Sequence, residues 1–156
     1  MPTVRAARVA DADALARLRY EFRSGERPAV ESRDAFVARC TAWMRERLAP
    51  GSSWHCLVAE HDGALVGHVW LEVMDKVPNP GANEPERHVY LTNLYVRPAA
   101  RGGLGSALLE AALAWCRERG ADTVMLWPSE KSRTLYARYG FAASSDVLVR
   151  SLKDGG

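Results

Sequence analysis

Residues 95–109 read YVRPAARGGLGSALL, and this stretch decides how the chain around it folds. A β-type run reaches a proline, glycines follow at 102, 103 and 105, and a helix-forming run begins at once. Glycine lets the backbone adopt positive φ and approach a ligand closely. The first N–H groups of a helix have no intrahelical partner and lie at the positive end of the helix dipole. The corner therefore predicts an anion site, most often one for phosphate.

The composition is that of one globular domain. The chain has 156 residues, 47% of them hydrophobic, and a formal net charge of +2. That charge is too small and too scattered to indicate a nucleic-acid or membrane partner. The N-terminus has no signal-peptide core, and no run approaches the roughly 20 apolar residues that span a bilayer. We therefore expect a single cytoplasmic domain over residues 1–156.

The metal-binding residue types are dispersed. Cys40, Cys56 and Cys116 lie far apart, each within an apolar pattern, which favours buried free thiols. The histidines share no metal-ligand spacing, so the sequence predicts no metal site.

Periodicity outlines a mixed chain. Helices are expected from Asp11, as a cap, to a break at 24–28, then at 32–48, 105–119 and 129–139. Strands are expected at 3–8, 54–60, 64–74, 88–96, 122–127 and 145–152, with an Asp-Gly hairpin turn joining the second and third. The order β-α-α-β-β-β-α-β-α-β indicates an α/β chain of the α+β type around a central sheet.

Several anions fit a glycine corner. A Walker loop needs G-x-x-x-x-G-K-[ST], which does not occur here. A dinucleotide site needs G-x-G-x-x-G and an acidic residue after the next strand, whereas "GGLGSA" has only G-x-G and the next strand ends in Trp127. A tight turn that binds nothing stays open, because glycine clusters are weak signals.

Two further features favour a ligand. The strand before the corner runs into Val-Arg-Pro, and a proline that ends pairing leaves backbone N–H and C=O groups free. Residues 134–141, TLYARYGF, place Tyr136 on a late helix before Gly140 and Phe141. In these motifs the sequence resembles the GCN5-related N-acetyltransferases (GNAT), which transfer an acetyl group from acetyl-CoA to an amine.

The resemblance covers nearly the whole chain in element order. It rests on "VRPAARGGLGSALL" for the family's acyl-CoA loop and on Leu135, Tyr136, Gly140 and Phe141 for its L/F-Y-x-x-x-G-F motif. Aligned from Pro98, the loop is one residue shorter than is usual in the family. The resemblance implies a central mixed, mostly antiparallel sheet with a splayed strand pair, flanked by helices.

It also implies a site for acetyl-CoA as acyl donor. The N–H groups from Arg101 to Ser106 would hold the pyrophosphate, and the pantetheine arm would add along the strand at 94–96. Ser129 takes the place of an asparagine that is frequent in the family. The residues assigned to the donor are Leu94, Tyr95, Val96, Arg101, Gly102, Gly103, Leu104, Gly105, Ser106 and Ser129.

The implied reaction is direct attack of a neutral amine on the thioester. Tyr136 would protonate the leaving thiolate, and a backbone N–H at Tyr95 or Val96 would stabilise the oxyanion. Glu72 or a chain of water molecules would take the proton of the amine. The alternatives are a non-catalytic acyl-CoA-binding sensor or interaction module, and a nucleotide-binding domain of another class.

The acceptor is expected to be a small-molecule or peptide amine. Its site is expected between the first two helices and in the loop after residue 74, and a homodimer is possible, as family members often dimerise. The residues proposed to line it or attract a cationic amine are His68, His88, Trp70, Tyr90, Asp75, Glu84 and Glu86.

Overall fold

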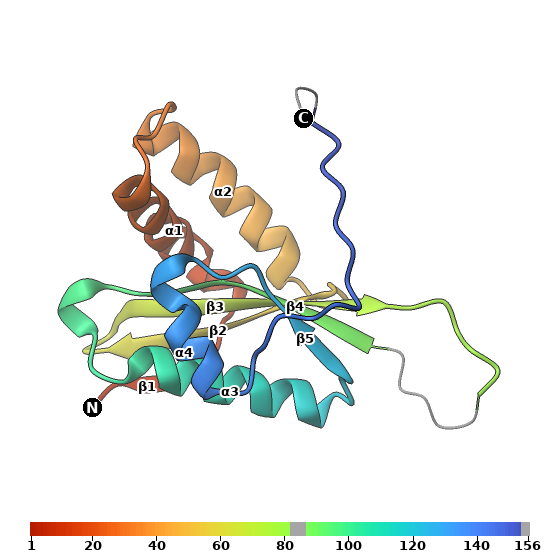
Figure 1. Ribbon diagram of the computed structural model, residues 1–156. Helices are drawn as coiled ribbons and strands as arrows, with labels where there is room; N and C mark the ends of the chain where they lie inside the picture. The colour runs from red at the N-terminus through yellow and green to blue at the C-terminus, as the bar shows by residue number, and fades with distance from the viewer. Residues whose placement is uncertain (82–86, 154–156) are drawn as a thin grey trace. The chain divides into compact units, whose positions relative to one another are not determined.

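The computed structural model describes residues 1–81 and 87–153, and the chain divides into two compact units, residues 1–126 and 127–156. The larger unit is built on a sheet with strand order β1-β2-β3-β4-β5 (Figure 1). Its neighbouring strands are antiparallel except β4 and β5, which are parallel. The expected mixed, mostly antiparallel sheet is thus confirmed. Its strands are β1 (Thr3–Ala6), β2 (Trp54–His61), β3 (Ala64–Asp75), β4 (Arg87–Val96) and β5 (Thr123–Met125).

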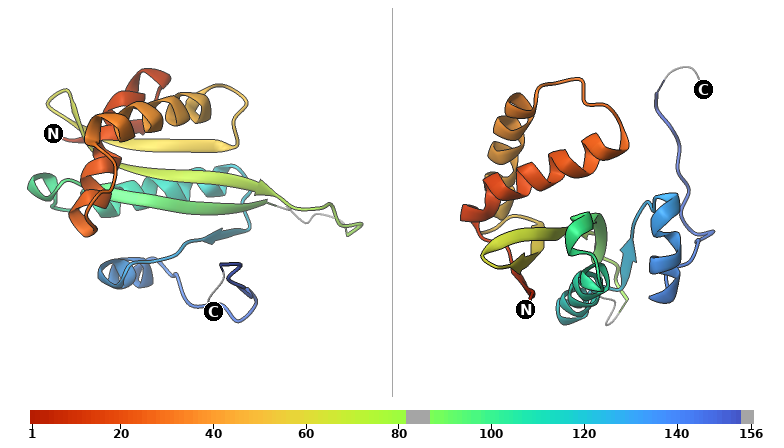
Figure 2. Two further views of the ribbon diagram at one scale, coloured as in Figure 1. Left: turned by 90° about the horizontal axis from the view of Figure 1, so that it is seen from above. Right: turned by 90° about the vertical axis from the view of Figure 1, so that its left-hand side faces the viewer.

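Helices cover both faces of strands β2 to β4. Helices α1 (Ala12–Glu26) and α2 (Arg33–Leu48) lie on one face and α3 (Leu104–Glu118) on the other, as Figures 1 and 2 show. Each helix turns a periodic apolar stripe toward the sheet. In α1 the buried residues include Leu15 and Leu18, and in α3 they include Leu108 and Ala112.

Strand β3 is buried on both faces because it lies between these helical layers. Val69 and Leu71, on one face, have no exposed surface. His68 and Trp70, on the other face, are 0% and 2% exposed. Trp70 belongs to the core cluster shared with α1 and α2. Side chains alternate between the two faces of a strand, so a strand covered on both sides is apolar at nearly every position.

The smaller unit contains a single turn η3 (Glu130–Ser132) and the helix α4 (Arg133–Arg138). The N–H of Phe141 donates to the carbonyl of Tyr136, and their rings meet edge to face at 5.4 Å. Gly140 has φ +85°, a conformation that ends the helix and that glycine adopts without strain.

Some predicted boundaries are wrong. Residues 145–152 form no strand: their alternating apolar pattern lacks a hydrogen-bonded partner among the described strands. The strand expected at 122–127 is limited to Thr123–Met125, and the helix expected at 129–139 is a 3₁₀ turn followed by α4. The first helix also runs through Ser24 and Gly25, because a lone glycine in a helix costs only about 1 kcal/mol.

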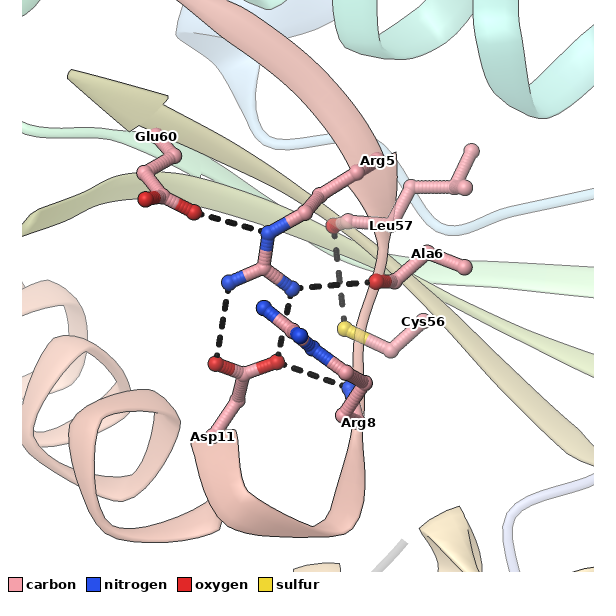
Figure 3. A network of polar contacts seen from close by, with 7 residues as sticks. All are labelled: Arg5, Ala6, Arg8, Asp11, Cys56, Leu57 and Glu60. Atoms are coloured by element: carbon pink, nitrogen blue, oxygen red, sulfur yellow. Dashed lines mark hydrogen bonds and ion pairs between the residues drawn. The ribbon is translucent and has the colours of Figure 1, made fainter. Parts of the chain in front are cut away.

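Asp11 does not cap α1 through its side chain, contrary to the expectation. It ends a short 3₁₀ turn, η1 (Val9–Asp11), and its carboxylate accepts hydrogen bonds from the Arg8 N–H and the Arg5 guanidinium (Figure 3). Arg5 also donates to Glu60 at 2.7 Å. The guanidinium holds the pKa of Asp11 below its usual value and ties β1 to η1 and β2.

Candidate functional site

The two edges of β4 end at different places. Along β3 the pairing continues from Arg87 to Val96, but along β5 it includes only His88, Val89 and Tyr90. Residues 91–96 therefore have one edge without a strand partner in the described part of the chain (Figure 1). β5 ends at Met125, opposite Tyr90, so the pairing of β4 with β5 stops where the family resemblance implied a splayed strand pair.

The direction of one backbone bond shows which groups occupy the open edge. The N–H of Arg97 donates to the carbonyl of Val66, on the β3 side, at 2.8 Å. Successive residues of a strand direct their N–H and C=O groups to opposite edges. Val96 therefore presents both groups to the open edge, where the Arg101 side chain donates to its carbonyl at 3.2 Å.

A β-bulge interrupts β4 just before this point. His68 pairs with Tyr95, but Trp70 pairs with Thr92, so Val69 faces both Asn93 and Leu94. Asn93 has φ +62°, the left-handed conformation that bulges of this kind require. Asn93 was not among the residues expected at the site, although an asparagine inside a β-type run is a signal of positive φ.

The glycine corner follows directly. After η2 (Pro98–Ala100), Gly103 has φ +97° and precedes α3, whose first bond joins the N–H of Ala107 to the carbonyl of Gly103. The N–H groups of residues 104–106 have no intrahelical acceptor, as in any α-helix. A methyl group added at Gly105 would meet no atom within 4 Å. The start of α3 thus has open space and unpaired donors, which suit an anion.

A cleft of about 450 Å³ lies at the corner, and Ala100, Arg101 and Leu104 are among the residues that line it. It includes Pro2, His61 and Val66, so it lies on the β3 side. Arg97, at its border, forms a two-bond ion pair with Glu21 of α1, at 2.8 and 2.9 Å. This pair, which the sequence did not indicate, fixes the start of the corner to α1.

Glu72 lies on β3 opposite Tyr90, at the level where β4 leaves β5, and accepts a hydrogen bond from the Ser53 hydroxyl at 3.3 Å. Four residues of strand separate Tyr90 from Leu94, which is about 13 Å at 3.3 Å per residue. The expectation that Glu72 acts as base stays a prediction, and at this distance it would need a chain of several water molecules.

The expected acceptor residues lie in different environments. His68 is fully buried, and burial lowers its pKa to about 3, so it is a neutral structural group rather than a lining residue. Nδ1 of His88 lies 3.3 Å from Oδ1 of Asp122. Trp70 packs in the core, within an aromatic cluster that also contains Trp43, Trp54 and Tyr90.

Of the loop acids, Asp75 ends β3 and is exposed. Glu84 and Glu86 lie outside the described residues. No group of three metal-ligating side chains gathers within residues 1–81 and 87–153, and no helix in those ranges is long and apolar enough to cross a bilayer.

Two expected site residues belong to the smaller unit. Tyr136 is 8% exposed, and burial raises its pKa to about 12. Its phenol is therefore protonated over the whole physiological range. Ser129 is exposed, and its hydroxyl lies 2.9 Å from that of Ser132.

The model of the Acetyltransferase (GNAT) family matches residues 15–141. The chain belongs to this family. It has the family's α+β fold. Acetyl-CoA is the typical donor of GNAT acetyltransferases, which act on amine acceptors.

Solved structures and curated relatives agree with this assignment. A GCN5-related N-acetyltransferase from Ralstonia eutropha JMP134 is 27% identical, has a TM-score of 0.79 and is aligned over 98% of this chain and 100% of its own. Mycothiol acetyltransferases of Cellulomonas flavigena and Thermobispora bispora are 36% and 41% identical over 59% and 60% of this chain. The matches span only 28% and 32% of those two proteins.

Proposed function

We propose that this GNAT acetyltransferase transfers the acetyl group of acetyl-CoA directly to a primary amine at the open edge of β4. The observation that carries the proposal is the succession of two features: an unpaired strand edge ends at Val96, and a glycine corner with free helix N–H groups follows. The first matches the amide-rich pantetheine arm, which adds to a strand edge, and the second matches the pyrophosphate.

The donor would be held mainly by backbone. Donors from Arg101 to Ser106 would bind the pyrophosphate, and Leu94, Tyr95 and Val96 would pair with pantetheine. Arg101 would have to exchange its bond to the Val96 carbonyl for one to the ligand. Ser129 would contribute a further hydrogen bond. A structure of similar fold from Clostridium acetobutylicum, described as a predicted acetyltransferase with acetyl-CoA, has a TM-score of 0.76 and 24% identity.

Of the two backbone N–H groups expected to stabilise the oxyanion, those of Tyr95 and Val96, we propose that of Val96. The N–H of Val96 is directed to the open edge, whereas that of Tyr95 is directed to β3, so Val96 is the better donor. A backbone N–H that is already fixed in position needs no reorganisation as negative charge develops on the thioester oxygen.

No enzyme thiol is suited to form an acyl intermediate, which supports direct attack. Burial raises the pKa of Cys40, raises that of Cys116 to about 11 and raises that of Cys56 well above its usual value. A thiol becomes a nucleophile as the thiolate, and these environments disfavour that form.

Tyr136 would assist the leaving group by donating a hydrogen bond to the CoA sulfur. Its pKa of about 12 lies above that of a thiol, about 8.5, so complete transfer of the phenol proton is uphill. We infer that the hydrogen bond stabilises the developing thiolate and that solvent supplies the proton. Glu72, acting through water, is the candidate base.

The test is release of the CoA thiol from acetyl-CoA with a panel of amines, including aminoglycosides, polyamines, peptides and the amine precursor of mycothiol. We expect amine-dependent turnover that falls about 100-fold in Tyr136→Phe, the effect of removing one donor to the developing negative charge, while acetyl-CoA affinity is kept. Tyr139→Phe, on the neighbouring turn, is the matched control and should keep full turnover. Binding of acetyl-CoA without turnover for any amine would favour the sensor alternative, and equal turnover in Tyr136→Phe would remove the role of Tyr136.

A further inference from the structure

The bulge in β4 changes which face each following side chain occupies. Thr92 lies opposite Trp70, and the extra residue at 93–94 brings Tyr95 opposite His68 on the same face. Without it, every later residue of β4 would point to the other face. Tyr95 instead stacks on Phe22 of α1, with ring centroids 4.9 Å apart and planes at 14°. The bulge thus sets the orientation of the whole open edge.

The Asn93 side chain is held from two other elements. The Arg19 guanidinium of α1 donates to Oδ1 at 2.6 Å, and Nδ2 lies 3.2 Å from Nδ1 of His68 on β3. A guanidinium has donors only, so the amide oxygen must face Arg19 and the amide nitrogen must face His68. Nδ2 then donates to Nδ1, and the imidazole proton is on Nε2. The donor or acceptor role of each group in the Arg19–Asn93–His68 network therefore follows from the Arg19 guanidinium, which can only donate.

One end of this network is fully buried, and its two hydrogen bonds are part-buried. His68 is fully buried, and its Nε2 has no hydrogen-bond partner among the described atoms. No ion pair joins Arg19 to a carboxylate in the described ranges, although burial lowers its pKa. Buried polar groups without partners reduce stability by about 1–3 kcal/mol. Replacing buried charged networks by well-packed apolar residues is often neutral or stabilising, so we do not assign these three residues to fold stability.

Building on the proposed function, we propose that Arg19, Asn93 and His68 are positioning residues that hold the β4 bulge in its left-handed conformation and so aim the backbone of Leu94–Val96 at the acyl-pantetheine. All three act on the backbone of β4, and none of them contacts the ligand in this proposal. The pyrophosphate end of the donor, at the start of α3, is independent of them. The network should therefore affect one end of the ligand and leave the other unchanged.

The experiment compares two ligands by calorimetry. Acetyl-CoA has the pantetheine arm, and 3′-phospho-ADP has the pyrophosphate without it. We expect Asn93→Ala and Arg19→Gln each to weaken acetyl-CoA binding by about tenfold and to change 3′-phospho-ADP binding less than about twofold. Asn93→Asp should restore most of the affinity, because its carboxylate accepts from Arg19, aspartate tolerates positive φ, and the His68 proton can move to Nδ1 and donate to the other carboxylate oxygen.

Arg17→Gln is the matched control, since it removes an arginine from the same helix that pairs with Asp13 at the surface. It should leave both affinities unchanged, and the unfolding temperature identifies any variant that does not fold. As a measurement independent of binding, ¹⁵N NMR of the unaltered chain should show the His68 proton on Nε2, and a proton on Nδ1 would overturn the assigned network.

The outcomes separate this inference from the proposed function. Equal losses for both ligands in Asn93→Ala and Arg19→Gln, or no loss in either, would overturn the positioning role while acetyl-CoA binding by the unaltered chain stands. Failure of the unaltered chain to bind acetyl-CoA would overturn the proposed function and this inference with it.

Discussion

The two halves of β4 differ in what holds them. Residues Arg87–Tyr90 pair with β3 on one side and, from His88, with β5 on the other. Residues Leu91–Val96 pair with β3 alone and contain the bulge at Asn93. A backbone group engaged in a ladder is not available to a ligand, so one stretch of strand cannot supply sheet stability and an open binding edge at the same position.

In residues Leu91–Val96, which do not pair with β5, side-chain contacts replace the second strand as support. Arg19 and His68 hold Asn93, Phe22 stacks on Tyr95, and Glu21 pairs with Arg97 just beyond the strand. Substitutions in the doubly paired half should therefore affect stability, whereas those around the open half should also change ligand affinity.

The largest expected effect is a pH dependence that originates beside the open half. The folded-state pKa of His68 is about 3, below the usual 6.5, because burial disfavours the imidazolium and Arg19 adds repulsion. Between these values the unfolded chain binds a proton that the folded chain does not, so stability is complete above pH 6.5 and falls as the pH falls. This contribution reaches about 1.4 kcal/mol per pH unit, or roughly 3 kcal/mol by about pH 4.

The measurement is denaturant unfolding at several pH values for the unaltered chain and His68→Asn. Asparagine keeps an acceptor near the position of Nδ1 and does not titrate. The variant should lose most of the slope below pH 6.5, and an identical slope in both proteins would contradict the buried neutral imidazole.

Val89→Ala tests the doubly paired half. Val89 is fully buried, so removing two methyl groups should lower the free energy of unfolding by about 2 kcal/mol. Acetyl-CoA affinity should not change. Thr92→Ala, in the open half on the other face, is the control and should cost less than about 0.5 kcal/mol. A reduced affinity in Val89→Ala would contradict the division of the strand.

Gly67→Ala tests the contact between β3 and the open half. The added Cβ would lie 2.9 Å from the Tyr95 carbonyl oxygen and 3.1 Å from Cγ2 of Val96, so β4 would have to move. We expect a loss of about 1–2 kcal/mol in stability, with weaker acetyl-CoA binding. Gly25→Ala, in α1, adds a methyl that meets no atom within 4 Å and should not destabilise. Unchanged affinity in a destabilised Gly67→Ala would show that this contact does not set the ligand edge.

The smallest effect is expected at Gly105→Ala, where stability and affinity should change in opposite directions. Alanine is the better helix former and meets no neighbour, so stability should rise by up to about 1 kcal/mol. The methyl would occupy the space assigned to the pyrophosphate, so acetyl-CoA should bind several-fold more weakly. Equal binding would mean that this space is not the phosphate site.

Local signals in the sequence were sufficient for much of this fold. Glycines placed the corner at residues 102–105, and the Asp-Gly turn placed the β2–β3 hairpin. The second helix was expected to begin at residue 32, and Ser32 is its N-cap. Each of these depends on residues within a few positions of one another, because caps and turns are closed by local hydrogen bonds.

Features that depend on distant partners were missed. Residues 145–152 alternate like a strand but have no strand partner in the described chain, and a strand forms only where a ladder does. Asp11 was expected to cap a helix, but Arg5, across a turn, engages its carboxylate. The Arg19–Asn93–His68 network joins three elements that are far apart in sequence, so no local pattern could indicate it.

The most direct test of the central claim is calorimetric titration of the unaltered chain with acetyl-CoA, with NADH and ATP as controls. The account predicts saturable binding of acetyl-CoA alone, in the micromolar range, with a loss of affinity when Gly105→Ala narrows the corner. Absence of binding, or equal binding of NADH or ATP, would contradict the assignment of the open edge and the glycine corner to an acyl-CoA.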